Sequence, residues 1–137
     1  MTEMDPAELN GGGVEWVIDA RGCDPRALAD REALERLFNK IIQEMELHPA
    51  AEAQWRQFPV THGVTGLLLL KESHLTVHTF PEHGTLCLNL FCCRVRAAGE
   101  FVAWLSEFQP EEVEVRRLER RLSRRLAPAC SATEATS

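Results

Sequence analysis

Residues 73–93, SHLTVHTFPEHGTLCLNLFCC, consist of two alternating runs on either side of a short Pro-Glu-His-Gly segment. Alternation of apolar and polar residues with a period of two is typical of strands that bury one face. Proline and glycine at positions 81 and 84 favour a turn between the runs. The stretch therefore predicts a β-hairpin in which SHLTVHTF pairs with TLCLNLFCC.

Strands are also predicted on both sides of this hairpin, because β-branched and aromatic residues gather there and turn residues bound them. The segments are VEWVIDARGCDP (14–25, ending in a Gly22–Pro25 turn), AQWRQFPV (53–60), VTGLLLLK (64–71) and EVEVRRL (112–118). The run at 64–71 is so continuously apolar that we expect neither of its faces to contact water.

Helices are predicted where apolar residues recur every three or four positions. One runs from Pro25 to about Leu47, with Asp24 or Asp30 available as the N-cap, and another covers 97–108, AAGEFVAWLSEF, before Pro110. The order β-α-β-β-β-β-α-β favours an α+β fold, a two-layer sandwich with an antiparallel sheet and helices on one face.

Length and composition predict one domain. The chain has 137 residues, of which 45% are apolar and 26% charged, as in ordinary globular proteins. We expect a flexible N-terminus over 1–13, a single domain over 14–126 and a disordered tail over 127–137. In the basic stretch RRLERRLSRRL (116–126), leucines four residues apart favour a helix with a solvated basic face.

Charge and cysteine content argue against several classes of protein. A net charge of −6 argues against general nucleic-acid binding, and no apolar run is long enough for a membrane span. The N-terminus lacks a secretory pattern, and five cysteines form no C-x-x-C pair, so we expect a cytoplasmic protein without a disulfide framework.

A hydroxyl, imidazoles and a carboxylate gather around Ser73. A serine hydrolase would need an exposed elbow such as G-x-S-x-G, whose glycines are missing here. His74 and His78 would lie about 13 Å apart along a strand, which is too far for one zinc ion, and no metal is expected. Taken as residues alone, these groups are either ordinary strand residues or parts of a site.

The motif resembles the short prokaryotic S-adenosylmethionine decarboxylase proenzymes, pyruvoyl-dependent enzymes of polyamine synthesis. The likeness rests on Glu-Ser-His at 72–74, a histidine five residues after the serine, an aromatic-Pro-Glu turn and a cysteine twenty residues after the serine. "GCD" at 22–24 and "GVTG" at 63–66 support it, so the resemblance covers most of residues 14–118.

This resemblance implies self-cleavage between Glu72 and Ser73. The serine hydroxyl would attack the preceding carbonyl, and β-elimination would leave residue 73 as a covalent pyruvoyl cofactor that forms a Schiff base with the substrate amine. It further implies that His78 assists processing and proton transfer, and that Cys93 is the proton donor after decarboxylation.

The same resemblance implies a substrate site. Glu82 matches the carboxylate that binds the ribose hydroxyls, and Phe58 is a candidate for stacking on adenine. Phe80 and Asp19 stand at further positions that shape the pocket. The substrate would be S-adenosylmethionine, the product would serve spermidine synthesis, and the enzyme would be a homodimer whose sites use both subunits, without nucleic acid or membrane.

The sequence departs from the usual family pattern mainly on the substrate side. Phe80 replaces a tryptophan, His83 a tyrosine, Asn89 an aspartate and Arg94 a glycine, and Ala20 and Arg21 replace aromatics. Two alternatives therefore stay open: a decarboxylase of arginine or ornithine, in which Arg21 could pair with the substrate carboxylate, and a catalytically silent homologue that regulates a partner.

Overall fold

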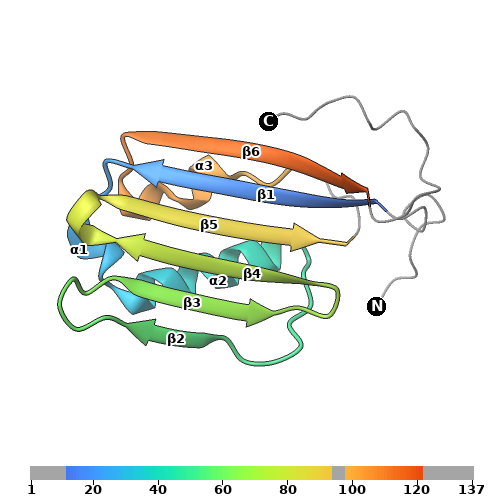
Figure 1. The fold of residues 1–137 in the computed structure, drawn as a ribbon, viewed down its shortest axis with the longest axis horizontal. Helices are drawn as coiled ribbons and strands as arrows, with labels where there is room; N and C mark the ends of the chain where they lie inside the picture. Colours follow the sequence, from blue (N-terminus) through green and yellow to red (C-terminus); the bar gives the residue numbers. More distant parts are fainter. Residues whose placement is uncertain (1–11, 94–97, 122–137) are drawn as a thin grey trace.

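The computed structural model describes residues 12–93 and 98–121 (Figure 1). The predicted order of strands and helices is confirmed. The elements are β1 (Gly12–Arg21), α1 (Pro25–Leu28), α2 (Arg31–Glu44), β2 (Gln54–Gln57), β3 (Val64–Leu69), β4 (Ser73–Phe80), η2 (Pro81–His83), β5 (Thr85–Cys92), α3 (Phe101–Trp104), η3 (Ser106–Phe108) and β6 (Glu112–Arg121). The tail predicted to be disordered, 127–137, lies outside the described residues.

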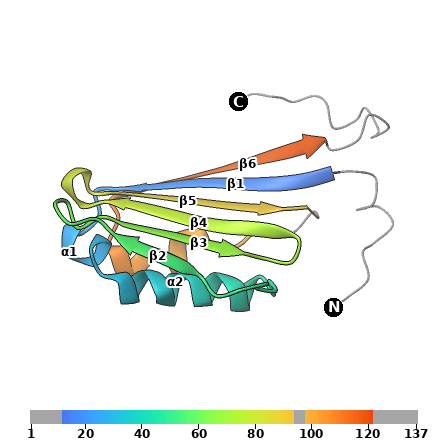
Figure 2. The same ribbon diagram turned by 60° about the horizontal axis from the view of Figure 1, so that its bottom comes forward.

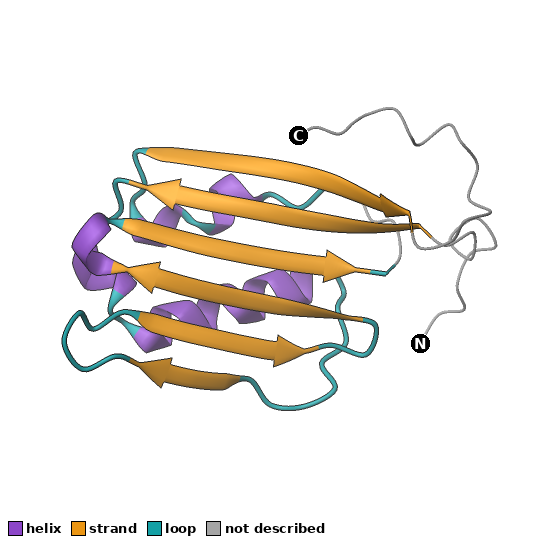
Figure 3. Cartoon of the chain, viewed as in Figure 1, coloured by secondary structure: helices purple, strands orange, loops and turns teal. Residues whose placement is uncertain are grey.

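All six strands form one antiparallel sheet in the order β2-β3-β4-β5-β1-β6. The helices cover one face of this sheet (Figures 2 and 3). The predicted α+β two-layer sandwich is thus confirmed. We call the other face, which no described element covers, the open face.

The predicted hairpin of β4 and β5 forms the middle of the sheet, with pairs running from Ser73 opposite Cys92 to Phe80 opposite Thr85. Gly84 closes the turn with φ 63°, a left-handed conformation that glycine adopts without steric cost. The backbone amide of Cys23 donates to the Gly84 carbonyl at 2.9 Å, which ties the turn to the end of β1.

The core lies between the sheet and the helices. One stripe of α2, formed by Leu34, Leu37, Phe38 and Ile41, is buried. It packs on the inward side chains of the strands, such as Ile18, Leu75 and Leu88, whose exposed fractions are at most 2%. Because strand side chains alternate, the residues between these inward ones point to the open face.

The helix predicted over 25–47 is wrong in one respect: two helices occupy this range. Asp24 caps α1 by accepting a hydrogen bond from the Arg26 amide, and Asp30 caps α2 by accepting one from the Glu32 amide. A second cap inside the stretch starts a new helix because its side chain competes for the backbone. The segment predicted as a helix over 97–108 likewise forms two short pieces, α3 and η3.

Two further predictions are wrong, one about burial and one about secondary structure. Leu67 and Leu69 of β3 are 46% and 62% exposed, although the 64–71 run suggested burial on both sides. The basic stretch is strand rather than helix as far as Arg121, because β6 pairs with β1 over its whole length. Pairing with a neighbouring strand outweighs the weak helical spacing of the leucines.

Within the described residues, no helix combines the length and the apolar composition needed to cross a membrane.

Candidate active site

The Glu72–Ser73 bond lies in a tight turn between β3 and β4. The amide of Leu70 donates to the Ser73 carbonyl at 3.0 Å, and the Ser73 amide donates back to Leu70 at 3.5 Å, so only residues 71 and 72 form the loop. The amide of Lys71 donates to the His48 carbonyl at 2.9 Å, which fixes the turn from one side. Glu72 and Ser73 are both half-buried.

Two cysteines stand beside this turn. Cys92 lies directly opposite Ser73 in the β4–β5 ladder and is 2% exposed. Cys93 follows immediately after the end of β5 and is half-buried. Ser73, Cys92 and Cys93 therefore gather at one end of the central hairpin, which we call the serine end.

His78 lies away from the serine end. Five residues of strand separate it from Ser73, a distance of about 16 Å at the usual rise per residue. The odd separation also places its ring on the open face, whereas Ser73 shares the face of buried Leu75. Within one chain the structure does not bring Ser73 and His78 together.

Thr65 is a neighbour of His78 that the sequence analysis missed. Its Oγ1 lies 3.0 Å from Nδ1 of His78, because the β3–β4 register puts the two residues opposite each other. Because Thr65 forms a hydrogen bond with Nδ1 of His78, Nε2 is the ring nitrogen that points outward. No sequence signal pointed to Thr65, since the pairing depends on a register that becomes visible only in the folded sheet.

The residues matched to substrate binding collect at the same end of the sheet as His78, which we call the histidine end. Phe80 ends β4 and is 39% exposed, and Glu82 follows in η2. Phe58 comes directly after β2, is 40% exposed and carries the Arg56 guanidinium 5.1 Å from its ring centroid. A polar turn with aromatic rings beside it can hold a flat, hydroxylated ligand.

Comparisons with known proteins identify the family of the chain. The family model described as "S-adenosylmethionine decarboxylase" matches residues 14–121, which is most of the chain and includes both ends of the sheet. The chain belongs to the S-adenosylmethionine decarboxylase family. The family predicted from the Glu-Ser-His motif is thereby confirmed, and this family is one of enzymes.

Individual members of the family are also similar to this chain. An S-adenosylmethionine decarboxylase proenzyme of Picrophilus torridus is 33% identical over 79% of this chain and 83% of its own. One of Pyrococcus furiosus is 32% identical over 64% of this chain and 62% of its own. The crystal structure of the adenosylmethionine decarboxylase from Aquifex aeolicus has the same fold, with a TM-score of 0.62, 20% identity and coverage of 80% and 88%.

Asp19 and Arg21, both of β1, are engaged in ion pairs on the open face of this decarboxylase. Arg21 donates to Glu112 and Glu114 at 2.9 Å each, and Arg116 donates to Asp19 at 2.8 Å. The hydrogen bond from Arg21 is the main reason why the pKa of Glu114 lies below its ordinary value. Arg21 already has carboxylate partners, so it is not a free cation for a substrate carboxylate.

Cys87 faces Asp19 across the β1–β5 pair and is an unreactive thiol. Burial and, second, a hydrogen bond with the Asp19 carboxylate raise its pKa to about 11, from an ordinary 9.0. Only the thiolate reacts with alkylating reagents. Cys87 therefore stays protonated and a poor nucleophile near neutral pH. It lies opposite His78, whereas Cys93 follows the residue opposite Ser73.

We expect iodoacetamide at pH 8 to modify Cys87 of the folded protein roughly 100-fold more slowly than in denaturant, because two pKa units lower the thiolate fraction by that factor. The rate should keep rising up to about pH 11, the pKa at which the folded thiol ionises. Mass spectrometry of the Cys87 peptide measures both. A rate that already levels off near pH 9 would contradict the assignment.

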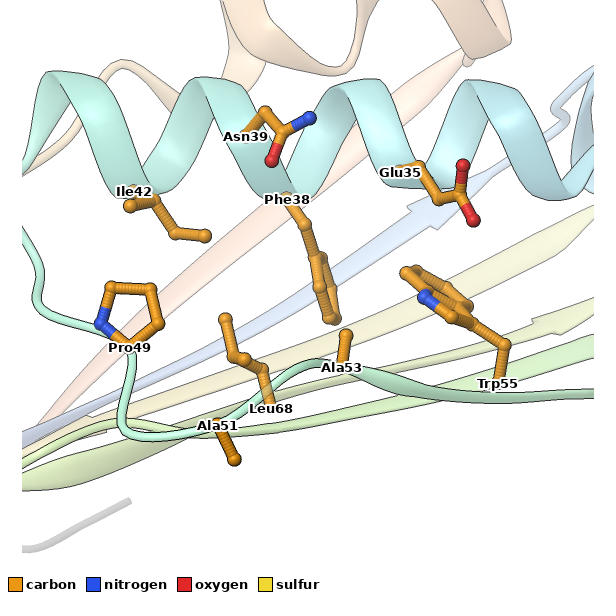
Figure 4. Close-up of a pocket in the computed structure, with 9 residues that line it drawn as sticks. All are labelled: Glu35, Phe38, Asn39, Ile42, Pro49, Ala51, Ala53, Trp55 and Leu68. Carbon is orange, nitrogen blue, oxygen red and sulfur yellow. The ribbon is translucent and has the colours of Figure 1, made fainter.

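A separate pocket of about 260 Å³ lies between α2 and the edge formed by β2 and β3 (Figure 4). Phe38 and Trp55 stand side by side in it with ring centroids 4.9 Å apart. The lining residues are Glu35, Phe38, Asn39, Ile42, Pro49, Ala51, Ala53, Trp55 and Leu68. None of them is a predicted catalytic or substrate residue, so the chemistry of the family is not expected there.

Proposed function

We propose that this protein is a self-processing, pyruvoyl-dependent decarboxylase that converts S-adenosylmethionine to its decarboxylated form, the aminopropyl donor for spermidine. One observation carries the proposal: in a chain of this family, the Glu72–Ser73 bond joins a two-residue turn to β4, and both Glu72 and Ser73 retain access to solvent. Among the described residues, the Ser73 hydroxyl has no hydrogen-bond partner that would hold it back from the Glu72 carbonyl.

The residues at this turn fit the formation of the cofactor. The Ser73 oxygen attacks the Glu72 carbonyl carbon, the C–N bond breaks, and an ester replaces the amide. Loss of the Ser73 α-proton then expels the Glu72 carboxylate, and the resulting enamine takes up water and releases ammonia, which leaves a pyruvoyl group. The tight turn already places residues 72 and 73 where the backbone reverses direction, so the cut does not break a ladder pair.

The pyruvoyl group supplies a ketone that can bind a substrate amine and withdraw electrons from a departing carboxylate. Cys93, beside it at the serine end, would return a proton to the substrate carbon. From the histidine end of a second copy, Glu82 would accept hydrogen bonds from the ribose hydroxyls, and Phe58 and Phe80 would cover the adenine. Asp19, although already paired with Arg116, would line the histidine end of the open face.

His78 requires a second copy of the chain. The serine end and the histidine end lie at opposite ends of one sheet, so two copies related by a twofold axis can bring the serine end of one to the histidine end of the other. The exposed Leu67 and Leu69 lie on the open face, opposite Thr76 and His74, and would be buried if the open faces of two copies packed together. We propose a homodimer with two composite sites.

Free thiols fit a reducing compartment. Cys23 and Cys87 form no disulfide bond with another described residue, and disulfides are rare where glutathione keeps thiols reduced. We therefore place the enzyme in the cytoplasm.

Intact-mass spectrometry and carbon dioxide release test the function together. We expect purified protein to give two fragments, residues 1–72 and 73–137, the second lighter by one ammonia than a simple hydrolysis product. Carboxyl-labelled S-adenosylmethionine should then release labelled carbon dioxide. An uncut chain would indicate a silent homologue, and release from arginine or ornithine alone would reject the proposed substrate. The pairing of Arg21 with Glu112 and Glu114 argues against that second outcome.

A further inference from the structure

A chain of polar side chains crosses the open face at the serine end. Arg120 of β6 donates from Nη1 to Oε1 of Glu15 at 2.9 Å, and Asn89 of β5 donates from Nδ2 to Oε2 of Glu15 at 2.9 Å. Oδ1 of Asn89 lies 3.2 Å from Nε2 of His74. Four neighbouring strands, β6, β1, β5 and β4, are thus linked in a row that ends at the residue after Ser73.

The chemistry of the groups fixes the direction of every bond in this row. The Glu15 carboxylate can only accept, so the amide nitrogen of Asn89 must face it and the amide oxygen must face His74. Since that oxygen also can only accept, Nε2 of His74 carries the hydrogen. The hydrogen bond from Asn89 is the largest reason why the pKa of Glu15 lies below its ordinary value, which keeps the carboxylate ionised.

Phe91 supports the row from within the sheet. Its ring centroid lies 5.8 Å from the His74 ring and 5.8 Å from the Arg120 guanidinium carbon. Phe91 is the residue directly opposite both His74 and Glu15 in the two ladders. The imidazole is therefore held by a hydrogen bond at Nε2 and by an aromatic contact with the ring of Phe91.

The position of His74 indicates what this hydrogen-bond network could do. In the proposed function, cleavage turns residue 73 into a chain end, and chain ends fray unless they are tied down. Residues 71 and 72 then no longer connect this end to β3. His74 is the first complete residue behind the reactive group, so its side chain is the nearest point at which that group can be held in place.

We propose that Arg120, Glu15 and Asn89 form a positioning device that clamps His74 and thereby holds the new chain end made by self-cleavage in register. The inference rests on the proposed function, but it assigns residues that self-cleavage itself does not need. The device acts after the cut, so disrupting it separates processing from turnover.

Asn89→Leu tests the clamp, because leucine has a similar size and no hydrogen-bonding group. We expect this variant to be cut at residue 72 to the same extent as wild type. Its kcat should fall roughly tenfold, because a reactive group displaced by about an ångström loses much of its rate. Hydrogen exchange of the amides at residues 74–76 should become at least about fivefold faster in the cleaved protein, as expected for the loss of one tethering hydrogen bond.

Glu15→Gln provides a second variant that preserves size and folding. Glutamine can donate as well as accept, so Asn89 is free to turn and offer its nitrogen to His74. Nitrogen NMR of the His74 ring in the uncut Ser73→Ala protein should show the Nε2–H form, and adding Glu15→Gln should introduce the Nδ1–H form. This readout does not depend on any catalytic activity.

Arg117→Gln is the matched control for Arg120→Gln. Arg117 lies on the same strand but faces the helical side, where its guanidinium carbon is 5.5 Å from the Trp16 ring centroid. Only Arg120→Gln should lower kcat. An Asn89→Leu protein with unchanged kcat and exchange, or an Nδ1–H form of His74 in the Ser73→Ala protein, would overturn the inference. A wild-type chain that stays uncut would overturn the proposed function itself and the role at a chain end with it.

Discussion

A Ser73→Ala protein should stay a single uncut chain and release no carbon dioxide from S-adenosylmethionine, because alanine has no oxygen with which to attack the Glu72 carbonyl. The expected loss is complete, since the cofactor is made from this one side chain. Intact-mass spectrometry and the labelled-substrate assay measure the two effects independently. The substitution should leave the fold intact, because Ser73 is half-buried and its side chain makes no hydrogen bond within the described residues.

Ser73→Cys is the informative companion. A thiol can attack the same carbonyl, so we expect slow cleavage at the same bond rather than none. Hydroxylamine, which attacks the resulting ester or thioester, should speed cleavage of wild type and of Ser73→Cys and leave Ser73→Ala unchanged. Cleavage of Ser73→Ala between residues 72 and 73 would refute the role of the serine and point to a contaminating protease.

Complementation between two inactive variants tests the composite site. If the serine end of one chain works with the histidine end of the other, co-expressed Ser73→Ala and His78→Ala chains should recover about a quarter of wild-type activity. Half of randomly formed dimers are mixed, and each mixed dimer has one intact site. Each variant alone should be nearly inactive, because its two sites are equally damaged.

The control uses two variants of the histidine end. Co-expressed His78→Ala and Glu82→Gln chains should not complement each other, since every mixed dimer would carry one lesion in each site. Recovery in this pair would show that the His78 and the Glu82 of one site come from different chains. No recovery in the first pair would show that Ser73 and His78 act within one chain. The fold would then have to change greatly, because about 16 Å of strand separates them.

The sequence predicted the sheet well because its signals were local. The alternation over 73–93 and the turn residues at 81 and 84 decide the central hairpin without help from distant segments. Local signals also explain the errors. Asp30 was recognised as a possible cap, but nothing nearby indicated that Asp24 and Asp30 would both be used. The spacing of the leucines after residue 116 could not reveal that β1 would be the pairing partner of this stretch.

For the candidate site, too, local sequence features were predicted and contacts between strands were not. The Glu-Ser-His motif and the positions of His78 and Cys93 are features of order along the chain, and they were enough to identify the family. The odd spacing between Ser73 and His78 is likewise a feature of order along the chain, and it puts the two residues on opposite faces of β4. By contrast, Thr65 beside His78, and Asn89 between Glu15 and His74, depend on which residues of neighbouring strands face each other. That register is set by the whole sheet.

The place of β1 between β5 and β6 has a consequence for the lifetime of the enzyme. Self-processing would put β1, β2 and β3 in one polypeptide and β4, β5 and β6 in the other. The strands of the two polypeptides would then be interleaved in one sheet. Neither polypeptide can dissociate without breaking three strand pairings at once, and the cleaved peptide bond cannot be re-formed afterwards. Once melted, such a molecule would have to find its other half by diffusion, so its heat inactivation should worsen with dilution and be largely irreversible.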